Sequence, residues 1–237
     1  MTSDRCLRAC ARGGLLLLLL AAGARPARAQ GVVTGTLALV ERAGAERADL
    51  RTGVVYLEAM GRRETGPGGS APRSATIAMR GREFFPHVQP VLAGGTVAFP
   101  NEDPFSHNVF SNVALGPFDL GLYRRGVTRA ATFGRPGVYP IYCNIHSRMV
   151  SFVVAVPTPW VAQPDADGRF RIRDVPAGDY LVHAWHERGG SEVTRAVTVP
   201  AGAGADVSFI IDARAWVSAP HLNKFGRPYT VSRADRY

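Results

Sequence analysis

The sequence predicts an all-β protein made of two consecutive β-sandwiches. Short runs rich in Val, Ile, Thr and aromatic residues recur at regular spacing along its 237 residues, and clusters of Gly, Pro, Asp and Asn separate them. No stretch after residue 30 carries a convincing 3.6-residue apolar period, which argues against helices. Many short strands at such spacing are typical of sandwich folds.

The first 29 residues predict a cleavable export signal. A positive start is followed by a run of Leu and Ala too short for the roughly 20 residues that span a bilayer. Ala27-Arg28-Ala29 is a small-x-small cleavage pattern, so we expect cleavage between Ala29 and Gln30. The mature protein is expected in the periplasm or secreted, without a stable membrane anchor.

Removal of the signal changes both the charge and the cysteine content. Five Arg and one Asp leave, so the formal net charge falls from +9 to +5. A mildly basic protein favours an acidic partner, and no Lys/Arg run is dense enough to predict nucleic-acid binding. Cys6 and Cys10 also leave, so Cys143 is the one cysteine after the cleavage site. Such a thiol is inert in a core, reactive, or bound to a metal.

We expect the first sandwich to occupy residues 30–156. Its predicted strands are 32–40, 52–59, 74–79, 82–88, 95–99, 127–133, 137–142 and 149–156. The segment 61–73 is dense in Gly, Pro and Arg and predicts a surface loop, and a polar loop follows Pro100.

Pro157-Thr158-Pro159 marks the predicted domain boundary, and residues 157–212 are expected to form a second, smaller sandwich. Its predicted strands are 168–173, 178–186, 191–199 and 206–211. Residues 213–237 mix Arg, Pro, Gly and Tyr without a period, which predicts an extended or disordered tail.

The chemistry is concentrated in Cys143, His146 and Met149. A strand delivers Cys143 to the end of a sheet, and a tight loop then offers an imidazole and a thioether. His107, in another loop at a strand end, is the expected second imidazole. Two imidazoles, a thiolate and a weak axial thioether form the ligand set of an electron-transfer copper site, because thiolate suits Cu(I) and imidazole suits both oxidation states.

Three other interpretations of these residues are less favoured. Zinc is disfavoured because Met is a poor zinc ligand. A Cys/His hydrolase lacks an orienting third group and an oxyanion signature. In the last interpretation, Cys143 is simply buried, and the nearby His and Met are incidental.

The wider pattern resembles the cupredoxins. The strand and loop Gly137–His146 is similar to the copper loop of plastocyanin and amicyanin, and the Cys143-to-Met149 spacing is similar to that of amicyanin. The pattern resembles plastocyanin-like proteins of the methylamine-utilisation type, and its further segments are Phe99–Asn101, His107–Ser111 and Phe118–Tyr123. The resemblance implies a Greek-key β-sandwich, one type 1 copper ion and a periplasmic setting.

The resemblance also implies that Asn108, the residue after the first His ligand, ties the two ligand loops together by hydrogen bonds. Ile145 departs from the family pattern, which has Pro between Cys and His. Arg148 would place a positive charge near the copper, which favours Cu(I). In the second sandwich, the run from Phe170 to Tyr180 resembles carboxypeptidase regulatory-like or transthyretin-like modules, which have no chemistry of their own.

Other polar and aromatic residues are expected to be structural. His183 and His186 point to opposite faces of a strand, which argues against joint ligation. Glu102 and Asp103 are expected to be solvated turn residues. Packing explains Tyr142, which precedes Cys143, without a role in an electron relay.

The expected function is a non-enzymatic electron carrier that exchanges single electrons with an unidentified redox protein. One alternative is a copper carrier or sequestering protein, and another is a docking protein that binds no metal. A single copper constellation argues against a copper oxidase.

Overall fold

The computed structural model describes residues 30–61 and 69–229. The predicted export signal, part of the 61–73 loop and residues 230–237 of the tail lie outside the described residues. Within those residues the regular elements are β-strands and two 3-10 turns, so the predicted all-β sandwich class is confirmed. No helix in these ranges is long and apolar enough to cross a membrane.

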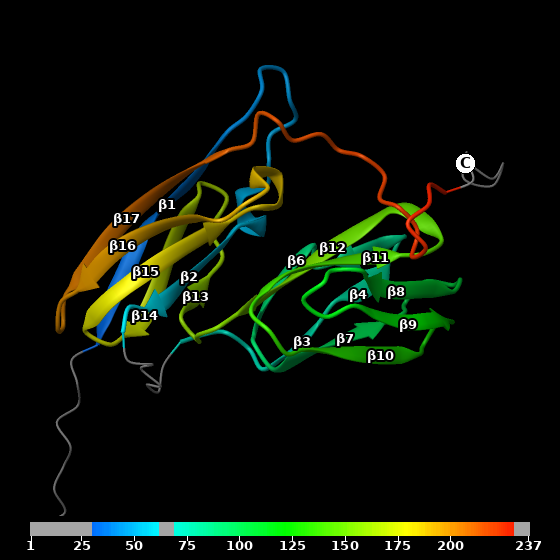
Figure 1. Cartoon of the computed structure of the whole chain (residues 1–237), viewed down its shortest axis with the longest axis horizontal. Helices are drawn as coiled ribbons and strands as arrows, with labels where there is room; N and C mark the ends of the chain where they lie inside the picture. The colour runs from blue at the N-terminus through cyan, green and yellow to red at the C-terminus, as the bar shows by residue number, and fades with distance from the viewer. Residues whose placement is uncertain (1–29, 62–68, 230–237) are drawn as a thin grey trace, which may run out of the picture.

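Strands from both ends of the described chain form one unit, which we call the terminal sandwich (Figure 1). Its strands are β1 (Gly31–Val40), β2 (Val54–Ala59), β13 (Val161–Ala162), β14 (Arg169–Val175), β15 (Gly178–Trp185), β16 (Val193–Val199) and β17 (Gly204–Asp212). One sheet has the order β14-β1-β17 and the other β13-β2-β15-β16. The 3-10 turns η1 (Leu50–Thr52) and η2 (Glu187–Gly189) belong to its connections.

The position of β1 and β2 corrects the predicted domain boundaries. Both strands were expected in the metal-binding unit 30–156, but β1 pairs antiparallel with β14 and parallel with β17. β2 pairs antiparallel with β13 and β15. The alternating pattern of a strand shows which face is buried but not which strand lies beside it. The order of the strands along the chain therefore did not predict which strands pair. The second sandwich therefore includes residues 31–59 as well as strands after residue 157.

Alternation builds the core of the terminal sandwich. Buried residues of the neighbouring strands β1 and β17 lie in one apolar cluster with residues of the other sheet, and Trp160 is completely buried in this cluster. The indole Nε1 of Trp160 donates to the carbonyl oxygen of Asp174 at 3.0 Å, which satisfies its polar atom.

The chain between β2 and β13 forms a second unit, the central sandwich. Its strands are β3 (Ser74–Thr76), β4 (Ala78–Arg80), β5 (Glu83–Phe85), β6 (Val88–Leu92), β7 (Gly95–Pro100), β8 (His107–Ser111), β9 (Phe118–Tyr123), β10 (Thr128–Phe133), β11 (Gly137–Cys143) and β12 (His146–Val156). Its sheets have the orders β10-β7-β3 and β6-β12-β11-β8-β9, and β4 and β5 form a separate hairpin. A cluster that includes Phe99, Phe133, Tyr139 and Ile141 fills the space between the sheets.

The two sandwiches contact each other through a small apolar cluster. Val54 and Trp185 of the terminal sandwich pack with Val88, Val154 and Val156 of the central sandwich. The pair of His87 and Glu187, with side-chain atoms 2.9 Å apart, also joins the two sandwiches.

The tail crosses from one sandwich to the other. It leaves the end of β17, where the Ala213 N–H donates to the Val40 carbonyl, and runs as an orange-to-red trace to the far end of the central sandwich (Figure 1). Residues 213–229 contain no strand or helix, in line with the extended chain expected. They are nevertheless fixed by specific contacts with the central sandwich.

Candidate metal centre

The hairpin of β11 and β12 places Cys143 and His146 at one end of the central sandwich. The two strands pair from Gly137↔Ala155 to Tyr142↔Val150, and the register then shifts so that Cys143 pairs with His146. The intervening turn is only two residues long. Cys143 is completely buried, whereas His146 is half-buried at the start of β12.

His107 reaches the same place from β8. This strand lies beside β11 in the sheet, with Phe110 paired to Tyr142, so the first residue of β8 lies near the last residue of β11. The His107 side chain is completely buried. Its ring centroid lies 4.9 Å from that of His146.

The three side chains converge on one point. Cys143 Sγ lies 3.6 Å from His107 Nδ1 and 3.5 Å from His146 Nδ1, and the three atoms lie within 4.8 Å of one another. A metal bonded to sulfur at about 2.3 Å and to nitrogen at about 2.0–2.1 Å, with angles near 109–120°, needs S···N separations of roughly 3.5–3.8 Å. Both sulfur–nitrogen separations therefore fit a bound metal ion, and the softness of the donor set fits copper.

Asp103 orients the buried imidazole of His107. Its Oδ2 lies 2.7 Å from His107 Nε2, which leaves Nδ1 free to face Cys143. The Asp103 carboxylate also accepts hydrogen bonds from the backbone N–H groups of Gly81 and Arg82. Burial opposes its charge, but the Arg82 N–H, His107 and the Gly81 N–H together hold the pKa of Asp103 below its ordinary value.

This finding corrects the expectation that Asp103 is a solvated turn residue. Asp103 is only 5% exposed because the turn from β4 to β5 wraps over it. Glu102, in contrast, is more exposed and pairs with Arg80 at 2.8 Å. The available signal in the sequence was a carboxylate four residues before a candidate His ligand, since a ligating His usually donates its second ring nitrogen to such a group.

Backbone N–H groups surround the Cys143 sulfur. Burial raises the pKa of the Cys143 thiol, whereas the N–H groups of Ile145, Asn108 and His146 act in the opposite direction. Such groups stabilise a thiolate once a cation is bound.

Asn108 connects the first ligand strand to its outer neighbour. Its backbone N–H faces Cys143, as noted above, but its side-chain amide donates to Asp119 Oδ1 on β9 at 2.6 Å. Asn108 therefore contacts the second ligand loop through its backbone N–H, while its side chain bonds to a third element.

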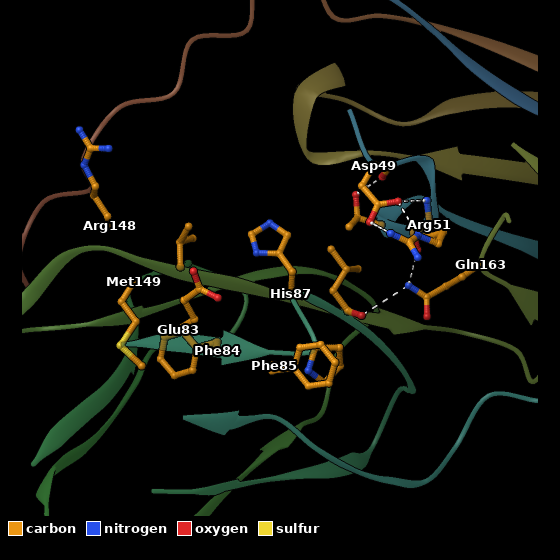
Figure 2. Close-up of a pocket in the computed structure, with 13 residues that line it drawn as sticks. Asp49, Arg51, Glu83, Phe84, Phe85, His87, Arg148, Met149 and Gln163 are labelled. Carbon is orange, nitrogen blue, oxygen red and sulfur yellow. Dashed lines mark hydrogen bonds and ion pairs between the residues drawn. The ribbon is translucent and has the colours of Figure 1, made fainter. Parts of the chain in front are cut away.

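Met149 lies in the same buried cluster as Cys143 and is 2% exposed. It also lines a cavity of about 510 Å³ between the two sandwiches (Figure 2). Its role as an axial ligand stays a prediction. Figure 2 shows the Arg148 guanidinium directed away from Met149, so the two neighbouring side chains lie on opposite sides of β12.

The remaining histidines lie outside the ligand trio. His183 stacks on Tyr56 with ring centroids 4.5 Å apart, and His186 is completely buried beside Thr52. His87 pairs with Glu187 at 2.9 Å between the two sandwiches. His221, which the sequence placed in the tail without a role, contacts the ligand loop together with Tyr229.

Comparison with known proteins gives similarity to solved structures alone. No protein-family model matches the sequence, and no curated protein matches it. A purple cupredoxin from Nitrosopumilus maritimus is 26% identical over 34% of this chain and 98% of its own, with a TM-score of 0.32. An oxidised amicyanin variant is 18% identical over 38% of this chain and 94% of its own, with a TM-score of 0.33.

A copper-containing nitrite reductase from Thermus scotoductus SA-01 is 28% identical, with a TM-score of 0.32. The match covers 41% of this chain and 24% of the reductase, so the chain spans about a quarter of that protein's length.

Proposed function

We propose that this protein is an exported blue copper protein that passes single electrons between redox partners. The observation that carries the proposal is the convergence of His107 Nδ1, Cys143 Sγ and His146 Nδ1 within 4.8 Å. These residues would hold the ion, with Met149 as the axial ligand. Bound copper would supply a Cu(I)/Cu(II) couple at this point.

The protein itself would hold the metal ligands in fixed positions and keep most of them away from water. Cys143 and His107 are completely buried, and the Asp103 carboxylate holds the His107 ring with Nδ1 towards the sulfur. The three ligands lie on three neighbouring strands of one sheet, β8, β11 and β12. Ligands held in this way move little between oxidation states, which favours rapid electron exchange over catalysis.

The proposal includes a redox protein as partner. The positive charge that remains after the predicted cleavage supports an acidic partner surface and an association that weakens with salt.

Visible and EPR spectra of the copper-loaded protein test the function. We expect an intense thiolate-to-copper band that is absent from Cys143→Ser and bleaches reversibly on reduction. His183→Ala is a matched control, because His183 lies outside the ligand trio, and it should keep the band. A colourless, redox-silent copper complex would contradict the proposal, and slow electron exchange with ready release of Cu(I) would favour the copper carrier instead.

A further inference from the structure

Residues 221–229 of the tail are bonded to the loop that carries two of the proposed metal ligands. The Tyr229 hydroxyl donates to the Cys143 carbonyl oxygen at 2.7 Å, and His221 Nε2 lies 3.1 Å from the His146 carbonyl oxygen. The His221 N–H donates to the Ser147 carbonyl at 3.0 Å. These contacts provide partners for carbonyl groups on both sides of the two-residue turn.

A second set of contacts comes from Lys224. Its backbone N–H donates to Asn144 Oδ1 at 2.9 Å, inside the same turn. Its Nζ lies 2.6 Å from Asp119 Oδ2, and the other oxygen of that carboxylate accepts from Asn108. Burial opposes the charge of Asp119, but Lys224 and Asn108 hold its pKa below the ordinary value. The tail thus bonds directly to the loop of Cys143 and His146, and Asp119 links it to Asn108, the residue after His107.

Aromatic contacts fix the orientation of this segment. The His221 ring stacks on Tyr142, with centroids 4.4 Å apart and an angle of 28° between the planes. The rings of Tyr229 and His221 meet in a T-shaped contact, with centroids 5.3 Å apart. Burial raises the pKa of Tyr229, so its hydroxyl stays protonated and remains a donor at neutral pH.

The connection to the terminal sandwich is looser. Residues 216–220 line a cavity of about 480 Å³ with Ser147 and Arg148, so this part of the tail does not pack tightly on the central sandwich.

We propose that His221 and Tyr229 are positioning residues for the metal-ligand loop, and that residues 221–229 act as a strap that holds Cys143 and His146 in their metal-ready arrangement. The proposal rests on the proposed function in that the loop is taken to bind a metal.

The first experiment uses the metal-free, full-length protein and the rate at which iodoacetamide alkylates Cys143. Loss of one hydrogen bond from the strap is expected to raise this rate by about fivefold in Tyr229→Phe and in His221→Ala, because local opening becomes more frequent. The double variant should react faster than either single variant. Leu222→Ala is the matched control, since that side chain is 52% exposed in the same segment, and its rate should equal that of the wild type.

The second experiment uses the copper-loaded protein. Tyr229→Phe should shift the thiolate-to-copper band and the reduction potential, while the urea midpoint of global unfolding stays unchanged. Equal alkylation rates, spectra and potentials in the wild type and the double variant would overturn the proposal that residues 221–229 position the ligand loop. If no variant binds copper but alkylation still depends on Tyr229, the strap stands and the proposed function fails.

Discussion

The Asp103 carboxylate lies 2.7 Å from the Nε2 of His107, and both side chains are buried. The contact makes a carboxylate–imidazole pair in which the second ring nitrogen faces the Cys143 sulfur. Such a pair fixes the tautomer and the ring orientation and increases the basicity of the ligating nitrogen. The affinity and potential of a bound metal should therefore depend on Asp103.

Asp103→Asn is expected to weaken copper binding by roughly 10- to 100-fold. The potential should rise, because removal of a negative charge near the metal favours Cu(I). Competition titration with a chelator and voltammetry measure the two effects. Glu102→Gln is the matched control: Glu102 is the neighbouring carboxylate but pairs with Arg80. Equal affinities for the two variants would contradict the orienting role of Asp103.

Trp160→Ala is expected to destabilise the protein by about 3–5 kcal/mol, since it removes a completely buried indole from the terminal sandwich. Urea unfolding followed by circular dichroism measures the change. Trp160 packs in a cluster that contains none of the proposed ligands, so the copper spectrum of the folded variant should be unchanged. Phe225→Ala should alter stability by less than about 0.5 kcal/mol because that side chain is 73% exposed. A spectrum altered by Trp160→Ala would show that the two sandwiches are coupled.

The His87–Glu187 pair predicts a pH-dependent contribution to stability. Burial opposes the charge of both groups, but their mutual hydrogen bond raises the pKa of His87 and lowers that of Glu187. The His87 contribution is complete below its ordinary pKa of about 6.5 and is lost as the pH rises through the raised value. The Glu187 contribution is complete above about 4.3 and is lost as the pH falls through the lowered value.

Unfolding of the metal-free wild type and of Glu187→Gln at several pH values tests this pH dependence of stability. The difference in unfolding free energy should be largest between about pH 4.5 and 6.5 and decline at pH 8.5. Its size should not exceed about 1 kcal/mol, because the His87 side chain is 34% exposed and solvent screens the pair. A difference that grows with pH would contradict the assignment.

Removal of copper is expected to lower the thermal midpoint. A ligand present at about 1,000 times its dissociation constant stabilises the native state by about 4 kcal/mol. Calorimetry of loaded and metal-free protein measures the shift, and Cys143→Ser should show little of it. A midpoint that is independent of copper in the wild type would favour the docking protein without metal.

Local pattern predicted much of the central sandwich. The expected strands 95–99 and 137–142 correspond to β7 and β11, and the expected strand 149–156 is the later part of β12. The convergence of His107 on Cys143 was inferred from the two strand ends and from the resemblance to the cupredoxins. In these cases, the information lies in alternation and in short-range spacing, which one sequence contains.

What could not be predicted depends on contacts between distant segments. The pairing of β1 with β17 joins residues about 170 positions apart, and nothing in either strand specifies the other. The burial of Asp103 depends on backbone groups of Gly81 and Arg82. The contact of His221 with the ligand loop depends on the path of a tail that has no periodic pattern.

The central sandwich is inserted between β2 and β13, and this order constrains how the protein is made. β1 emerges early during synthesis, yet its parallel partner β17 is completed only at Asp212. Every strand of the central sandwich lies between them in the sequence. This unit can therefore complete its own strand pairing before β17 is available to pair with β1. The central sandwich is thus expected to fold first, and the pairing of β1 with β17 completes the terminal sandwich afterwards.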